Sequence, residues 1–272
     1  MNTQHTYTKI VATIGPSSNS YEMIKDIIEA GARVIRLNFS HGTHEDKQAA
    51  YDAARKASAE LDTPIAIFQD LQGPKIRLGQ LKEESFVILS GESITLTTET
   101  IVGTKEIVSI DYPYLHEEIS IGNRILIDDG LIGLEVTSIQ GNQIICTVVE
   151  GGVVKPRKGV NLPGVPLHHL SSFTKKDKKD LEFAFKNDVD YVALSFVRSE
   201  KDVIALKDYM VKTYGKKIPI ISKIEKPEAV KAIEKIIKHS EAIMVARGDL
   251  GVEMFAEEVP IAQKSIIRAS HV

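Results

Sequence analysis

The stretch Ile10-Val11-Ala12-Thr13-Ile14-Gly15 begins the part of the sequence that decides the fold. It has the apolar, β-branched character of a buried strand, and residues 33–40 and 65–71 repeat that character. Between these strands, apolar residues return at helical spacing. A β-α-β-α-β rhythm of this kind predicts a parallel sheet whose strands are connected by crossover helices.

Start and stop signals bound the two helices of this first part. Asn19 or Ser20 is a suitable N-cap for the first helix, and Gly31 is a suitable end. Thr43 is followed three residues later by Asp46, which is the pattern of a capping box at the start of the second helix. These signals place both helices between the expected strands.

Residues 76–166 interrupt the rhythm, and we find no convincing helix in them. Turn signals such as Asp129-Gly130 and Gly141-Asn142 separate short alternating strands. The expected strands are 93–96, 124–127, 134–136 and 144–149. The pattern predicts a small all-β domain at 76–166, inserted into an α/β domain formed by 1–75 and 167–272.

After residue 170 the alternation of strands and helices returns. Strands are expected at 191–197, 218–225 and 242–246, and a last helix at about 259–270. The expected helix starts in this part are Thr174 with Asp177, Ser199 with Asp202, and Pro227.

About six β/α units result, whereas a complete (β/α)8 TIM-type barrel has eight. Two folds stay open: an incomplete barrel, or an open doubly wound sheet. A doubly wound sheet normally has a Gly-rich nucleotide loop after its first strand, and Ile14-Gly15-Pro16-Ser17-Ser18 is not such a loop.

Composition excludes several classes of function. A net charge of −3 gives no reason to expect nucleic acid or an anionic membrane as a partner. The single cysteine, Cys146, cannot form an internal disulfide and lies in a strand pattern, which favours a buried core position over a nucleophile. No apolar run reaches transmembrane length, and the polar residues 2–8 do not resemble a signal peptide. We therefore expect a cytoplasmic protein.

Unusual polar residues lie at or just beyond the carboxyl ends of five of the expected strands. In a parallel β/α array the carboxyl ends of the strands form the reactive face. A single Asp or Asn at a strand end more often caps the next helix or turn, but five successive strand ends with such residues predict an active site. The residues concerned are Arg36, Asn38, Ser40, Asp70, Arg198, Lys223, Glu225, Arg247 and Asp249.

The residue types suggest the chemistry of that site. Arg36 and Lys223 are cations suited to phosphate and to developing negative charge. Glu225 and Asp249 offer hard oxygen ligands, which suit Mg²⁺ or Mn²⁺. The basic stretch 155–159, taken alone, is typical of a solvated loop. On a domain that folds over the reactive face, it could bind the phosphates of a nucleotide. The pair His168-His169 is interpreted as polar loop.

Six segments together resemble the pyruvate kinase family, over essentially the whole chain. They are 8–18, Arg36-Leu37-Asn38-Phe39-Ser40-His41-Gly42, Asp128-Asp129-Gly130, Lys158-Gly159-Val160-Asn161-Leu162-Pro163-Gly164, 221–225 and Ala246-Arg247-Gly248-Asp249-Leu250-Gly251. The resemblance implies a (β/α)8 barrel, an inserted β-barrel lid and a C-terminal α/β domain. It also implies glycolytic transfer of a phosphoryl group from phosphoenolpyruvate to ADP, giving pyruvate and ATP, with Mg²⁺ and often K⁺.

The resemblance also implies roles for particular residues. Arg36 would hold the phosphate, and Lys223 would stabilise the moving phosphoryl group and the enolate. The backbone of Gly248 and Asp249 would receive the substrate carboxylate. The expected Mg²⁺ ligands are Glu225 and Asp249; the expected K⁺ ligands are Asn38, Ser40, Asp70 and Leu71; the expected nucleotide contacts are Asn38, Phe39, Ser40, His41, Arg77 and Lys158.

The chain departs from the family pattern at two positions of one segment. Many relatives have threonine and then glutamate where this chain has Leu71 and Lys75. A lysine at the second position goes with independence from K⁺ in this family. We therefore expect an enzyme that needs no monovalent cation.

The chain ends after the sixth unit, at Ser270-His271-Val272. The last two barrel units of the family, a threonine of strand seven and the C-terminal domain are not in it. We expect this chain alone to be weakly active or inactive, and the full-length form to be a homo-oligomer, a tetramer. Two other interpretations stay open: a binding module without catalysis, and another Mg²⁺-dependent barrel acting on phosphoenolpyruvate or pyruvate, such as a lyase.

Overall fold

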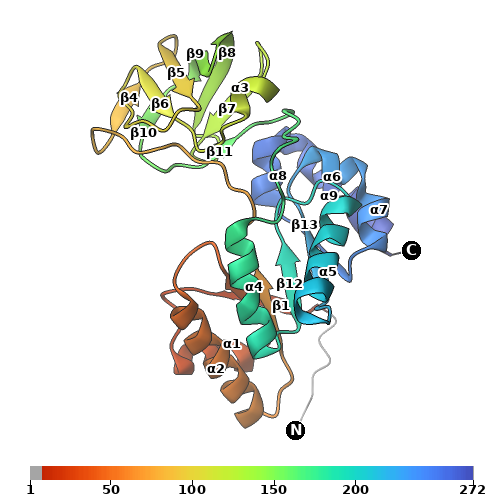
Figure 1. Cartoon of the computed structure of the whole chain (residues 1–272). Helices are drawn as coiled ribbons and strands as arrows, with labels where there is room; N and C mark the ends of the chain where they lie inside the picture. Colours follow the sequence, from red (N-terminus) through yellow and green to blue (C-terminus); the bar gives the residue numbers. More distant parts are fainter. Residues whose placement is uncertain (1–7, 272) are drawn as a thin grey trace. The chain divides into compact units, whose positions relative to one another are not determined.

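A computed structural model describes residues 8–271 of the chain (Figure 1). These residues divide into two compact units, each treated separately below. The first comprises residues up to 73 together with 172–224 and 232–244, and the second comprises 74–171, 225–231 and the residues from 245 onward. The domain boundaries expected from the sequence remain a prediction.

A six-stranded sheet underlies the first unit, with the strand order β1-β2-β3-β12-β13-β14. The strands are β1 (Ile10–Ile14), β2 (Ala32–Asn38), β3 (Ala66–Asp70), β12 (Tyr191–Leu194), β13 (Ile220–Ile224) and β14 (Ala242–Val245). The pairs from β1 to β13 are all parallel. A doubly wound sheet reverses its strand order at a switch point, whereas this order follows the sequence without reversal. The sheet is therefore wound in one direction, as in a barrel.

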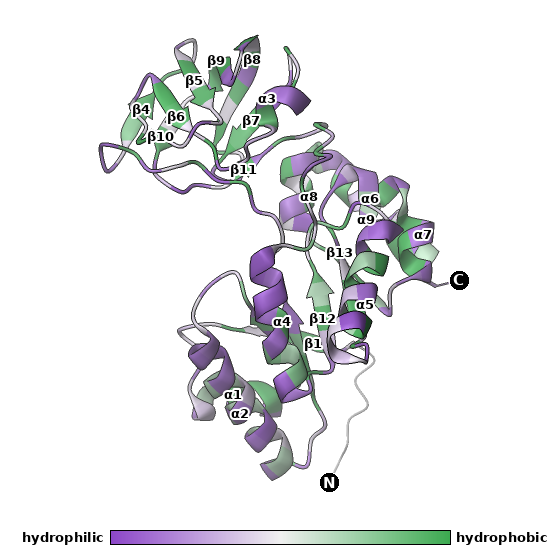
Figure 2. Cartoon of the chain, in the orientation of Figure 1, coloured by the Kyte–Doolittle hydropathy of each residue, from purple (hydrophilic) through white to green (hydrophobic). Residues whose placement is uncertain are grey.

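The helices expected between these strands form where the sequence places their caps. They are α1 (Tyr21–Glu29), α2 (His44–Glu60), α4 (Lys175–Asn187) and α5 (Glu200–Tyr214). The side chain of Ser20 accepts a hydrogen bond from the Met23 amide, and Thr43 forms a capping box with Asp46. Hydrophilic colours predominate along α4 in Figure 2, as expected for a helix that presents one stripe to a core and the rest to water.

The helix expected after Pro227 is interrupted. It forms as α6 (Pro227–Lys231) and α7 (Ile233–Lys238), with Ala232 between them outside both. In the second unit, α8 (Arg247–Glu253), a 3-10 turn (Ala256–Glu258) and α9 (Val259–Ser270) complete the chain. Leu250 of α8 packs with Val259 and Ala262 in a small apolar cluster.

Residues 74–171 of the second unit, here called the β segment, contain two sheets, in which all pairs of strands are antiparallel except β5 with β6. One sheet has the order β11-β7-β8-β9-β5-β6, and a separate pair joins β10 to β4. The strands are β4 (Phe86–Ile88), β5 (Ser93–Thr97), β6 (Ile107–Ser109), β7 (Arg124–Ile127), β8 (Ile132–Gln140), β9 (Gln143–Glu150), β10 (Gly152–Val154) and β11 (Val160–Asn161). The four strands expected from the sequence are present as β5, β7, β8 and β9.

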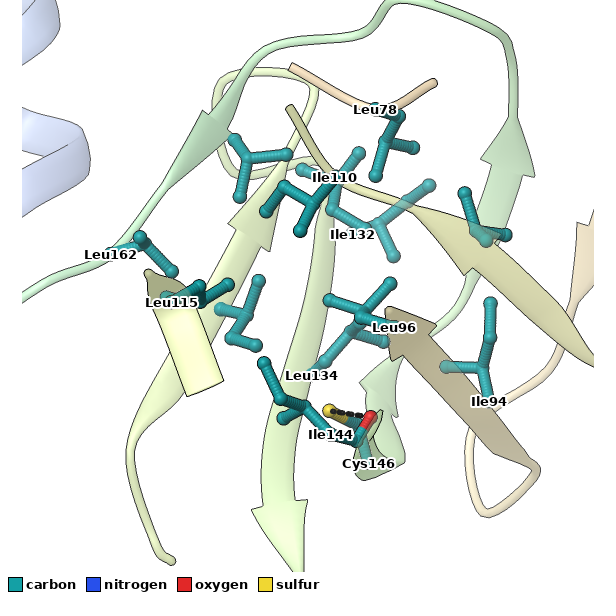
Figure 3. Close-up of a cluster of buried hydrophobic side chains, with 14 of the residues drawn as sticks. Leu78, Ile94, Leu96, Ile110, Leu115, Ile132, Leu134, Ile144, Cys146 and Leu162 are labelled. Atoms are coloured by element: carbon teal, nitrogen blue, oxygen red, sulfur yellow. Dashed lines mark hydrogen bonds between the residues drawn. The ribbon is translucent and has the colours of Figure 1, made fainter. Parts of the chain in front are cut away.

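The expectation that this region contains no helix is wrong in one place, because α3 (Leu115–Glu118) forms a single turn. Leu115 is fully buried and anchors that turn in the core. Figure 3 shows this core, in which side chains such as Ile94, Leu134 and Cys146 converge from several strands. Cys146 is buried core, as expected. Across residues 8–271, no helix has both the length and the apolar character needed to cross a bilayer.

Candidate active site at the strand ends of the parallel sheet

Asp70 is the centre of a charged cluster in the first unit. It is the last residue of β3 and is only 1% exposed. Its Oδ2 accepts from Arg36 Nε at 2.7 Å, and its Oδ1 lies 3.3 Å from Lys223 Nζ. Arg36 belongs to β2 and Lys223 to β13, so three strands of one sheet contribute to the cluster.

Ser195 completes this arrangement, which we call the Asp70 cluster (Arg36, Asp70, Ser195 and Lys223). Lys223 Nζ donates to Ser195 Oγ at 2.9 Å. The Ser195 hydroxyl in turn donates to the carbonyl oxygen of Leu71 at 2.7 Å. The ammonium of Lys223, 7% exposed, is therefore fixed by a carboxylate and a hydroxyl rather than by solvent.

Two of the four side chains in the Asp70 cluster are cations. Two cations, Arg36 and Lys223, share the single carboxylate of Asp70. Burying charged groups is costly, so proteins do so where the groups are paired or where they serve a ligand. The Arg36 side chain is 26% exposed and its Nη1 also contacts Thr13 Oγ1 at 3.2 Å. The cluster thus presents positive charge with a partly open guanidinium, which suits phosphate or a carboxylate.

Local backbone geometry holds these groups close together. Gly73 has φ +67°, and a Cβ there would lie 2.9 Å from a ring carbon of Phe196 and 3.0 Å from the Cβ of Ser195. Phe196 itself adopts φ +54°, which is rare for a bulky residue. Strained backbone of this kind collects at functional sites, where the surrounding structure over-determines it.

The expected Mg²⁺ ligands lie in the second unit. Glu225 directly follows β13 and is 1% exposed, whereas Asp249 lies exposed in the first turn of α8, beside Gly248. Within the part of the chain that the structure describes, no group of three or more His, Cys, Asp or Glu side chains is arranged to hold a metal. Two carboxylates remain the candidate donors, and their oxygens are the type that Mg²⁺ or Mn²⁺ prefers.

The expected K⁺ ligands all have partners within the protein. Asn38 Oδ1 accepts from the Ser40 amide at 3.0 Å, and the carbonyl oxygen of Leu71 accepts from Ser195. The Asp70 carboxylate is engaged by Arg36 and Lys223. The only ion pair of Lys75 among the described residues is with Asp129, at 3.6 Å.

The expected nucleotide contacts are spread over both units. In the first, His41 is exposed, whereas the ring of Phe39 is 3% exposed and packs against Phe183 at a centroid distance of 5.1 Å. The Phe39 side chain is thus core, which leaves its backbone as the candidate contact.

In the second unit, Lys158 pairs with Asp128 at 2.9 Å. The Arg77 amide donates to Asp111 at 2.6 Å, and burial raises the pKa of the Asp111 carboxyl while that amide acts in the opposite direction. The His169 ring lies 2.8 Å from a Glu118 oxygen, so the histidine pair belongs to a local hydrogen-bond network.

Neither Ser195 nor Thr13 was predicted to have a role, although Ser195 belongs to the Asp70 cluster and Thr13 contacts Arg36 of that cluster. A serine or threonine at a strand end is common, so residue type alone carries little signal. The position of Ser195 is more informative than its type, because Ser195 directly follows β12, and β12 lies between β3 and β13 in the sheet. A singly wound α/β sheet that gathers two cations around one buried carboxylate at its strand ends is typical of a barrel-type α/β protein, whose active site lies at that face.

Comparison with known proteins identifies the family. The family "Pyruvate kinase, barrel domain" matches residues 5–272, nearly the entire chain. The chain belongs to the pyruvate kinase family, as its sequence segments suggested.

Named relatives agree with this assignment. The chain is 47% identical over 261 residues to a pyruvate kinase of Corynebacterium efficiens, covering 96% of this chain and 55% of that protein. It is 46% identical over 260 residues to a pyruvate kinase of Mycobacterium intracellulare, with the same coverage. A crystal structure of a pyruvate kinase from Cryptosporidium parvum superposes with a TM-score of 0.90 at 37% identity, covering 96% of this chain and 55% of that one. The chain therefore spans about half the length of these relatives.

Proposed function

We propose that this chain supplies the catalytic face of an enzyme that transfers the phosphoryl group of phosphoenolpyruvate to ADP, giving pyruvate and ATP. The observation that carries the proposal is the Asp70 cluster, where Arg36 and Lys223 share one buried carboxylate. Phosphoryl transfer needs little covalent help from a protein; it needs positioned positive charge around the transferred group. The guanidinium of Arg36 and the ammonium of Lys223, held in place by Asp70, provide that charge.

The roles divide between two kinds of group. Arg36 binds the phosphate with its partly exposed guanidinium, and Lys223 stabilises charge on the moving phosphoryl group and on the enolate oxygen. The backbone amides of Gly248 and Asp249, in the first turn of α8, receive the substrate carboxylate. Asp70 and Ser195 orient the Lys223 ammonium.

Glu225 and Asp249 are the residues that would hold Mg²⁺ or Mn²⁺. Their carboxylates are hard donors, which fits a divalent cation of this type and not a soft metal. When bound, such an ion supplies positive charge to the phosphate and enolate oxygens. The proposed nucleotide contacts are Asn38, Phe39, Ser40, His41, Arg77 and Lys158.

We propose that the enzyme needs no monovalent cation, because the side-chain ammonium of Lys75 supplies a fixed positive charge in place of K⁺. With ionic strength held constant by tetramethylammonium chloride, replacing K⁺ should change the turnover rate by less than about twofold, since a fixed charge needs no soluble substitute. A rate that collapses without K⁺ and returns with it would overturn this proposal and would assign Asn38, Ser40, Asp70 and the carbonyl of Leu71 to a K⁺ site. Cytoplasmic location and a tetrameric full-length form also remain predictions.

The main test replaces Lys223 by glutamine in the full-length protein that carries this chain. Pyruvate formation from phosphoenolpyruvate and ADP should fall about 100- to 1,000-fold, the usual cost of removing one preorganised charge-stabilising donor. The matched control is Lys216→Gln, because Lys216 is 57% exposed and, among the described residues, contacts only the exposed Asp188 and, at 6.0 Å, the ring of Phe185. Phosphoenolpyruvate bound without any pyruvate formation by the wild type would instead support a binding module.

A further inference from the structure

A buried carboxylate outside the Asp70 cluster connects three segments of the second unit. Glu253, the last residue of α8, is 4% exposed. Its Oε1 lies 2.7 Å from Lys226 Nζ and accepts from Asn161 Nδ2 at 2.8 Å. This contact could not be predicted from the sequence, because the three residues lie far apart along the chain.

Each partner of Glu253 leads to a different part of the protein. Lys226 directly follows Glu225, and Asn161 is the last residue of β11, which pairs with β7 of the β segment. Glu253 itself lies four residues after Asp249, one helical turn along α8. One side chain therefore holds the segments that carry both proposed metal ligands and a strand of the β segment.

Burying the ion pair between Glu253 and Lys226 costs free energy, which indicates that the pair does more than stabilise the fold. The Lys226 side chain is 12% exposed, so the ion pair is almost fully desolvated. The second oxygen of Glu253 is buried and has no hydrogen-bond partner among the described residues. Buried ion pairs with unmet hydrogen-bond capacity stabilise a fold less than apolar residues of the same volume would, whereas they do fix geometry.

We propose that Glu253 is a positioning residue that sets the distance between Glu225 and Asp249 through Lys226 and α8, and joins this pair to the β segment through Asn161. The inference rests on the proposed function, because it takes these two carboxylates as the metal ligands. Outer partners of metal ligands typically change metal affinity about 10- to 100-fold when they are removed.

The test measures Mn²⁺ binding by electron paramagnetic resonance in the full-length protein, apart from any turnover. Glu253→Gln keeps an acceptor but removes the charge, and should weaken Mn²⁺ binding about tenfold. Lys226→Met should have a similar effect and Lys226→Arg, which keeps the ion pair, a smaller one. Asn161→Ala removes only the link to the β segment and should weaken binding less than Glu253→Gln. Glu257→Gln is the matched control, because Glu257 is exposed just beyond α8 and should leave binding unchanged.

A second measurement needs no metal. Hydrogen exchange of the α8 amides in metal-free Glu253→Gln protein should be faster than in the wild type. Glu253→Gln and Asn161→Ala proteins that are folded and bind Mn²⁺ within twofold of the wild type would overturn the inference alone, even if both melt at lower temperature. A wild-type protein that neither binds Mn²⁺ nor forms pyruvate would overturn the proposed function, and the inference with it.

Discussion

The parallel sheet and the β segment bury different kinds of side chain. In the described residues, every buried charged side chain lies outside the β segment, namely Asp70, Asp177, Asp180, Lys223, Glu225 and Glu253. The buried polar residues of the β segment are only Thr97 and Ser109, and its core is a continuous cluster of apolar side chains (Figure 3).

This difference separates chemistry from stability. Buried charge costs free energy, and the chain accepts that cost at and near the ends of parallel strands, where the candidate active site lies. The β segment buries no charged side chain, and its apolar side chains pack as in an ordinary protein core. Substitutions in the two regions should therefore differ in whether they affect turnover or unfolding.

The largest effect should come from Asp70→Asn. This change leaves Arg36 and Lys223 close together without their shared carboxylate, so both turnover and stability should fall. Removing one partner of a buried ion pair costs about 3–5 kcal/mol, and the misplaced Lys223 should lower kcat/KM by about 100-fold or more. Urea unfolding and a pyruvate-formation assay measure the two effects on the same protein.

The control is Asp188→Asn, since Asp188 is 84% exposed and pairs with exposed Lys216. Exposed pairs contribute little, so this variant should resemble the wild type in both assays. An Asp70→Asn protein with wild-type turnover would break the comparison, because the buried charge at the strand ends would then have no catalytic role.

The sequence predicted the two regions unequally. Lys223, Glu225 and Arg36 could be singled out as candidates because charged residues in otherwise apolar strands are conspicuous, and the two-residue period places alternate residues on one face. Ser195 and Glu253 could not be, because their contacts join segments far apart in sequence. In the β segment, β4, β6, β10 and β11 have only two or three residues each, too few for periodicity to reveal.

Leu134→Ala tests the other side of the comparison. Leu134 lies in β8 and is fully buried in the core of the β segment. The lost contacts and the cavity left behind should cost about 2–5 kcal/mol in the free energy of unfolding. Turnover by the protein that remains folded should change little, because no charge is disturbed.

The matched control for Leu134→Ala is Leu131→Ala. Leu131 is 72% exposed in the same segment, so its truncation should cost almost nothing in urea unfolding. If Leu134→Ala lowered turnover of folded protein as strongly as Asp70→Asn, the separation of chemistry from stability would be wrong.

The smallest effect concerns Cys146, whose thiol is enclosed by the same core. Burial raises the pKa of this thiol from 9.0 to about 12. The folded state therefore holds the proton more tightly than the unfolded state, so the free energy of unfolding should fall as pH rises above about 9, through a window that ends near 12.

Other groups also titrate in this pH window, so the informative quantity is the difference in the free energy of unfolding between wild type and Cys146→Val, measured in urea at pH 8 and at pH 10. That difference should favour Cys146→Val more at pH 10, because valine cannot ionise in the unfolded chain. A difference that is equal at both pH values would mean that the thiol ionises as easily in the folded core as in water, and that the β segment is less tightly closed than its apolar packing indicates.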